Sequence, residues 1–82
     1  MIEESIASAL DREVTKADAK YGNFRSTHEG LGVLLEEFTE LQDAIHDNDL
    51  VEVRIEAIQV AAVALRIAAA CKDKDCQKRS VP

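Results

Sequence analysis

The chain of 82 residues carries a net charge of −6, and 46% of its residues are hydrophobic while 4% are aromatic. This length leaves room for one domain, and an acidic middle segment (residues 29–56, with Arg54 as its one base) argues against binding the nucleic-acid backbone. No apolar run reaches membrane-spanning length and the N-terminus lacks a signal peptide, so we expect a cytoplasmic protein without membrane contact.

The composition and the first apolar pattern both indicate helices. The hydrophobic residues are chiefly Ala, Val, Leu and Ile, and the single Pro is the last residue, so an all-α fold is expected. A first amphipathic helix is predicted over about residues 2–20, and Gly22-Asn23 should end it. Its apolar residues recur at helical spacing: Ile2, Ile6, Leu10, Val14, Ala17 and Tyr21.

A capping box marks the predicted start of the second helix. Ser26-x-x-Glu29 places a hydroxyl acceptor before the first turn and a carboxylate that can reach back. The helix should therefore begin near Thr27 and run to about His46. Its apolar stripe is expected to face the core: Leu31, Leu34, Leu35, Phe38, Leu41 and Ile45.

The third helix should start after Asp49, which can cap it, and run from about Leu50 to Ala70 or Cys71. Between residues 57 and 70 its only polar residues are Gln59 and Arg66. A helix that is apolar all round is buried all round, and two neighbours in so short a chain cannot cover it. We therefore predict a three-helix protomer, residues 1–71, that completes a helical bundle by homo-oligomerisation, as a homodimer or a dimer of dimers. Residues 72–82 are expected to form a frayed or disordered basic tail.

Two acidic motifs indicate a candidate metal site: Glu37-x-x-Glu40 on the second helix and Glu56-x-x-Gln59 on the third. Residues three apart point to the same side of a helix, so two such helices could form a cage of oxygen ligands. That donor set suits Mg²⁺ or Mn²⁺. Two alternatives remain open at this point: a solvated acidic face, and a structural network in which Arg54 or Arg66 pairs across the helices.

The remaining candidates are weaker. Asp43-x-x-His46 resembles half of a di-iron carboxylate motif. The chain has no second such pair, although a homodimer would supply one by symmetry, and His46 also suits a helix C-terminus. Cys71 and Cys76 are expected to be reduced thiols, because cysteines stay reduced in the cytoplasm. Their spacing matches no zinc site.

Taken in order, these segments resemble the MazG-like, all-α nucleoside triphosphate pyrophosphohydrolases. The two acidic motifs are similar to the family's E-x-x-E … E-x-x-D signature. Residues 19–22 (Ala-Lys-Tyr-Gly) resemble the K-x-G that ends the first helix in small phage and gene-cassette members, and residues 35–41 resemble their G-E-E-x-x-E-L segment. The likeness spans roughly residues 17–70.

The resemblance implies an activity and a set of site residues. Family members cleave a nucleoside triphosphate to the monophosphate and pyrophosphate. Glu37, Glu40, Glu56 and Gln59 would then form the metal site, with the ion bridging phosphate oxygens and helping to generate the attacking hydroxide. Glu36, beside the catalytic Glu37, would be a further ligand or the base that orients the water. Basic side chains would stabilise phosphate charge, with three candidates: Arg66, Lys72 and Lys74.

The chain departs from the family pattern at Gln59, where the full motif has Asp. An amide oxygen contributes a dipole rather than a charge, so we expect weaker Mg²⁺ binding and a site that fills only when a triphosphate brings its own oxygens. Longer relatives also continue beyond the third helix, so dimerisation would have to complete the core and the site. Two functions stay open: an Mg²⁺-dependent pyrophosphohydrolase acting on a canonical or modified (deoxy)nucleotide, and a catalytically silent helical dimer that binds a nucleotide or a protein.

Overall fold

Three α-helices make up the part of the chain that the structure, a computed structural model, describes (residues 4–72). They are α1 (Ile6–Tyr21), α2 (Thr27–His46) and α3 (Leu50–Ala70), and no strand occurs within these residues. The prediction of an all-α fold is confirmed. None of these helices is both long and apolar enough to cross a lipid bilayer.

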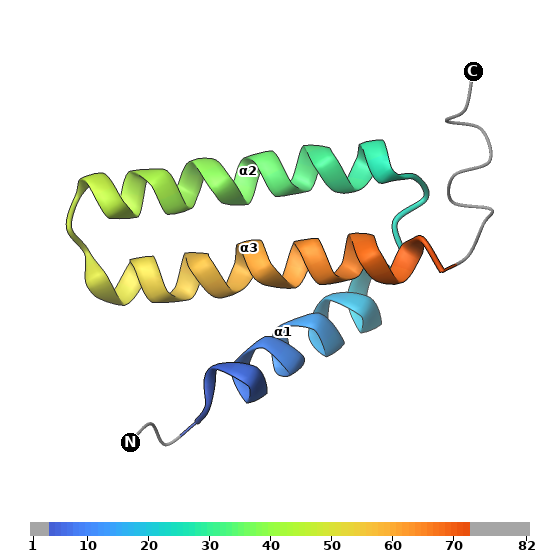
Figure 1. Cartoon of the computed structure of the whole chain (residues 1–82), viewed down its shortest axis with the longest axis horizontal. Coiled ribbons are helices and arrows are strands. Elements are labelled where there is room, and N and C mark those ends of the chain that lie inside the picture. The colour runs from blue at the N-terminus through green and yellow to red at the C-terminus, as the bar shows by residue number, and fades with distance from the viewer. Residues whose placement is uncertain (1–3, 73–82) are drawn as a thin grey trace.

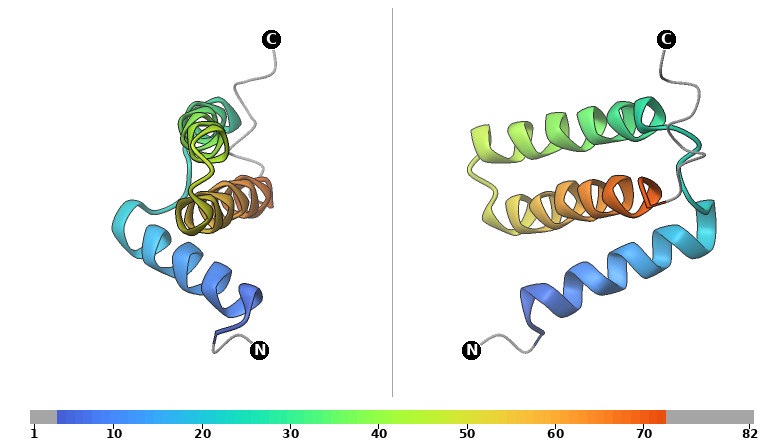
Figure 2. Two further views of the ribbon diagram at one scale, coloured as in Figure 1. Left: turned by 90° about the vertical axis from the view of Figure 1, so that its left-hand side faces the viewer. Right: turned by 45° about the vertical axis from the view of Figure 1, so that its right-hand side comes forward.

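The third helix lies between the other two. α2 and α3 run antiparallel, side by side, and α1 packs against another side of α3 (Figure 1). When the molecule is viewed along α2 and α3, α1 crosses α3 obliquely (Figure 2). The helix in which apolar residues are most continuous is therefore the one that both neighbours share.

Local capping residues set the helix boundaries. The Ser26 hydroxyl accepts a hydrogen bond from the Glu29 amide at 3.1 Å, and Asp49 accepts one from the Glu52 amide at 3.1 Å. Glu29 also reaches back, as expected, and its carboxylate accepts from the amide of Arg25 at 2.7 Å. The predicted spans of α2 and α3 are confirmed, and His46 lies in the last turn of α2.

The start of α1 differs from the prediction. Helical periodicity suggested a beginning at residue 2, but the helix begins at Ile6, because the Ser5 hydroxyl caps it by accepting from the Ser8 amide at 3.0 Å. Ile2 lies outside the described residues, as do residues 73–82 of the predicted tail. At the other end Gly22 terminates α1 with a positive φ of 74°, a conformation that favours glycine.

A small core joins α3 to α2 and to the loop between α1 and α2. Phe24, Val63 and Ala70 are buried together, and Val33, Leu34 and Ile67 pack against them. Gly30 is buried at the same place. A side chain there would be too close to α3, since an added Cβ would lie 2.6 Å from Cγ1 of Ile67.

Arg66 links α1, the following loop and α3. Its buried guanidinium donates to the Asp18 carboxylate at 3.1 Å and to the Gly22 carbonyl at 3.0 Å, and it lies 4.3 Å from the centre of the Phe24 ring. Burial of an arginine requires such partners. The cross-helix pairing considered for Arg66 is therefore present, although its partner is α1 rather than the acidic helix.

The apolar stripe of α2 is not all core, which corrects the prediction. Leu34 and Leu41 are partly buried. Four other members stay about half exposed: Leu31 (47%), Leu35 (55%), Phe38 (52%) and Ile45 (51%). Their spacing puts them along one side of α2, and their exposure shows that α3 does not cover this side. On α3 itself, four large apolar residues are also exposed: Leu50, Val51, Ile55 and Leu65. One protomer thus leaves much apolar helix surface uncovered.

The two glycines near the start of α2 give a matched test of this packing. Gly30→Ala should lower the free energy of unfolding by ~1–3 kcal/mol, because Ile67 and Phe24 must move to admit the methyl group. Gly32→Ala, where no atom lies within 4 Å, should raise it by ~0.5–1 kcal/mol through helix propensity. Urea unfolding followed by circular dichroism measures both. Equal shifts of the same sign would contradict the close approach of α2 to α3.

Candidate functional site

Three carboxylates converge where α2 faces α3. Glu37 and Glu40 come from successive turns of α2 and Glu56 comes from α3, and one oxygen of each lies within 4.8 Å of the other two. The spacing of three residues aligns the α2 pair, and the antiparallel neighbour brings Glu56 opposite them. The structure therefore brings together three of the four residues predicted as metal ligands. We call these three the carboxylate cluster.

The carboxylate cluster is electrostatically strained. Oε1 of Glu56 is buried without a hydrogen-bond partner. Burial, reinforced by the neighbouring Glu37 and Glu40, raises the pKa of Glu56 to about 7. Burial also raises the pKa of Glu37, with a further contribution from the charge of Glu40. Acids crowded in this way favour either a retained proton or a bound cation.

Gln59 turns towards α1 instead of the acidic helix. Its amide nitrogen donates a hydrogen bond to the Glu13 carboxylate at 3.0 Å, and this bond is the largest cause of the lowered pKa of Glu13. The reason is geometric. Positions three apart on a helix differ by about 60° in direction, and α1 and α2 occupy different sides of α3. Glu56 therefore meets α2 while Gln59 meets α1, where we had expected both to face the acidic helix.

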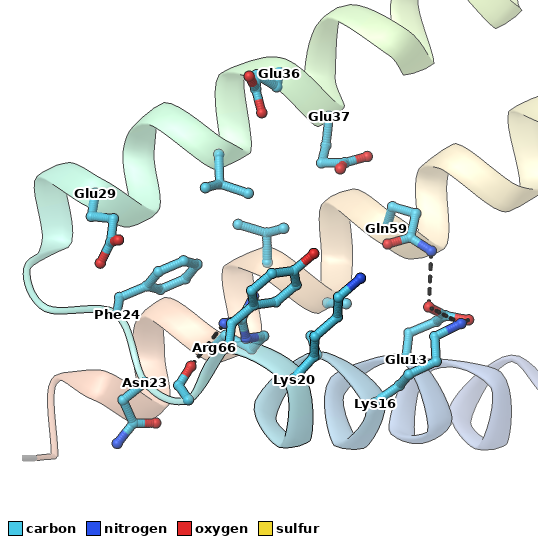
Figure 3. A pocket seen from close by; sticks show the side chains of 16 residues that line it. Glu13, Lys16, Lys20, Asn23, Phe24, Glu29, Glu36, Glu37, Gln59 and Arg66 are labelled. Atoms are coloured by element: carbon cyan, nitrogen blue, oxygen red, sulfur yellow. Dashed lines mark hydrogen bonds and ion pairs between the residues drawn. The ribbon is translucent and has the colours of Figure 1, made fainter.

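A cavity of about 510 Å³ lies between the three helices (Figure 3), and one member of the carboxylate cluster belongs to its wall. Glu37 belongs to both the cluster and the cavity wall, and Glu36 lies beside it on the wall. Glu36 is exposed and is not one of the three converging carboxylates. The opposite walls come from α1 and α3, and their polar residues include Glu13, Lys16, Lys20, Gln59 and Arg66.

The basic residues of the cavity are not all those that the sequence suggested. Lys16 and Lys20 line it from α1 and are exposed, yet we had assigned phosphate contacts to Arg66, Lys72 or Lys74. The available signal was their spacing, since residues 13, 16 and 20 share one side of a helix. Arg66 also reaches the cavity, but its guanidinium is already bound by Asp18 and Gly22.

The aromatic residues divide between core and cavity. Phe24 lines the cavity but is 8% exposed and lies under Arg66, so it belongs to the core. Tyr21 is 68% exposed on the cavity wall. Phe38, which we had assigned to the core, is half exposed and does not line this cavity. Nζ of Lys20 lies 5.2 Å from the centre of the Tyr21 ring, so the opposite face of this ring is the one open to a ligand.

Other candidates of the sequence do not gather into a site. Asp43 and His46 join no group of converging ligand residues within residues 4–72. Cys71 is an exposed free thiol, while Cys76 and Lys74 lie outside the described residues.

No protein family, curated protein or solved structure matches this chain. The likeness to the MazG-like family thus rests on the motifs alone and stays a prediction.

The raised pKa of Glu56 predicts how stability changes with pH. The pKa of Glu56 in the folded chain is about 7, above its ordinary value of 4.5. The contribution of Glu56 to the free energy of unfolding is therefore fully present below pH 4.5 and is lost as the pH rises through about 7. The raised pKa of Glu37 acts in the same direction. With EDTA present, the free energy of unfolding should be lower at pH 8 than at pH 5. Glu56→Gln should reduce this difference.

Glu52→Gln provides the control for this measurement. It removes an exposed acid from the same helix, so the loss of stability between pH 5 and pH 8 should match that of the wild type. An unchanged loss in Glu56→Gln would show that Glu56 does not titrate near neutral pH.

Proposed function

We propose that this protein is an Mg²⁺-dependent nucleoside triphosphate pyrophosphohydrolase, which cleaves a (d)NTP to the (d)NMP and pyrophosphate. The observation that carries the proposal is the carboxylate cluster with its unpartnered buried oxygen, at the edge of a cavity that two lysines line. Acidic oxygens suit the metal, and the lysines suit the phosphates that such a metal accompanies.

The residues present fit a divalent cation. Glu37, Glu40 and Glu56 offer hard oxygen donors within 4.8 Å of one another, as Mg²⁺ and Mn²⁺ prefer. The buried Oε1 of Glu56 has no hydrogen-bond partner, and a cation would satisfy it. Gln59 lies outside the carboxylate cluster, but its amide lines the adjoining cavity, from which its oxygen would complete the donor set. Once bound, the metal supplies positive charge to the phosphate oxygens and acidifies water.

The cavity fits a nucleotide. Its volume of about 510 Å³ lies within the ~300–1,000 Å³ of small-molecule sites. Lys16 and Lys20 neutralise phosphate charge from α1, and the exposed ring of Tyr21 offers a face to the base. Glu36, exposed beside Glu37, accepts a proton from water and orients it towards the phosphate.

A nucleotide panel tests the activity. Pyrophosphate release should require Mg²⁺ or Mn²⁺, should stop with EDTA, and should fall at least ~100-fold in Glu40→Gln, which removes one charged ligand. Asp43→Asn is the matched control, because it removes an exposed acid one turn further along α2 that is outside the carboxylate cluster. If the folded protein releases pyrophosphate from no nucleotide, the silent nucleotide- or protein-binding module replaces the enzyme.

We also propose that the protomers associate through the exposed apolar side of the α2–α3 hairpin. On α2 this side consists of Leu31, Leu35, Phe38 and Ile45. On α3, the small exposed residues Ala57, Ala64 and Ala68 recur at helical spacing and allow a close helix contact. The acidic residues that line the cavity lie on a different side of α2. Packing of two hairpins would form a four-helix bundle and bury the uncovered surface.

Charge placed on this side should separate the protomers. Phe38→Lys and Leu35→Lys should give the protomer mass of 9.0 kDa in analytical ultracentrifugation, where the wild type gives twice or four times that mass. Tyr21→Lys, which changes an even more exposed ring on α1, should leave the mass of the assembly unchanged. A wild-type protein that sediments as a monomer at millimolar concentration would contradict the proposed association.

A further inference from the structure

Within residues 4–72, a hydrogen bond between Glu13 and Gln59 links α1 to the second acidic motif. The amide nitrogen of Gln59 lies 3.0 Å from Oε1 of Glu13, and the pair is partly buried. The Glu13 side chain is 15% exposed, and Lys16 lies 3.4 Å from it. Figure 3 shows the pair at the edge of the cavity, with the amide nitrogen directed at Glu13.

We propose that Glu13 is a positioning residue: by binding the amide nitrogen of Gln59, it directs the amide oxygen away from α1 as a ligand for the divalent cation. This inference rests on the proposed function, because it assigns Glu13 a role in the same metal site. Gln59, which stands where the family motif has Asp, thus has a hydrogen-bond partner on α1.

The first argument concerns hydrogen-bond polarity. An ionised carboxylate only accepts hydrogen bonds, whereas an amide carries a donor nitrogen on one side and an acceptor oxygen on the other. Glu13 therefore selects one of the two orientations of the Gln59 amide. Lys16 favours the charged form of Glu13 and so supports this selection.

The second argument concerns competition. Gln59 lies one helical turn from Glu56 and shares the cavity wall with Glu37. In an acidic site, an untethered amide would turn its NH₂ group towards these carboxylates and occupy lone pairs that a cation needs. The bond to Glu13 holds the NH₂ group on the far side. Glu13 thus prevents Gln59 from acting as a competitor of the metal.

The third argument concerns charge. A carboxylate at position 59 would stand about 3.0 Å from that of Glu13, where like charges repel strongly. Gln59→Glu alone should therefore gain little. Exchange of the two residues, Glu13→Gln with Gln59→Glu, restores the hydrogen bond in the reverse direction and leaves a full charge facing the metal.

The experiment measures Mn²⁺ affinity from the electron paramagnetic resonance signal of free Mn²⁺, without nucleotide. Glu13→Ala should weaken binding about tenfold or more, as loss of an orienting partner does. Asp11→Ala is the control, because it removes an exposed acid from the same helix and should leave the affinity unchanged. The exchanged pair should bind Mn²⁺ more tightly than the wild type.

A double-mutant comparison separates positioning from a general structural effect. In a Gln59→Ala background, Glu13→Ala should have no further effect on Mn²⁺ affinity, because the residue through which it acts is gone. An equal loss in both backgrounds would overturn the proposal. If circular dichroism shows that Glu13→Ala does not fold, Glu13→Gln and the exchanged pair are measured instead. An exchanged pair that does not bind Mn²⁺ more tightly than the wild type would then overturn the proposal.

The outcomes also distinguish this inference from the proposed function. Mn²⁺ binding by the wild type that Glu13→Ala leaves unchanged would overturn the role of Glu13 and leave the metal site standing. Absence of Mn²⁺ binding by the wild type, both without nucleotide and with a non-hydrolysable triphosphate analogue, would overturn both. Pyrophosphate release measured beside these variants shows whether any change in affinity reaches the reaction.

Discussion

The close approach of α2 to α3 at Gly30 is the constraint on which the site depends. An added Cβ at Gly30 would lie 2.6 Å from the Ile67 side chain, so the two helices meet where one has no side chain. Further along the same pair of helices, Glu37 and Glu40 meet Glu56 within 4.8 Å. Carboxylates can converge this closely only because the backbones that carry them are held side by side.

That convergence is costly to the protomer itself. A buried oxygen of Glu56 without a partner, next to other acids, destabilises the folded state when all are ionised. Local features elsewhere agree with the fold, since the caps, the helix-terminating Gly22 and the partners of Arg66 are all satisfied. Among residues 4–72, Glu56 carries the buried side-chain oxygen that lacks a partner, and a local conflict of this kind is typical of a functional site, where binding of a ligand offsets the cost.

The first helix completes the site without supplying any of the converging carboxylates. Asp18 at its C-terminal end holds Arg66, and Glu13 one and a half turns earlier holds Gln59. Both bonds join α1 to the same side of α3, and the cavity lies between them and α2. α1 therefore fixes the far wall of the cavity and places Lys16 and Lys20 along it.

The boundaries of α2 and α3 follow from local sequence, because Ser26 and Asp49 begin these helices with local hydrogen bonds. The spacing of the acidic motifs also indicated that Glu37, Glu40 and Glu56 would meet. Which sides of the helices face one another depends on how the three helices pack. α3 is apolar nearly all round, so its periodicity does not say which neighbour each residue meets. That Gln59 turns to Glu13, and that Phe38 is left half exposed, therefore follow from the placement of α1 and α2 around α3 rather than from spacing along the chain.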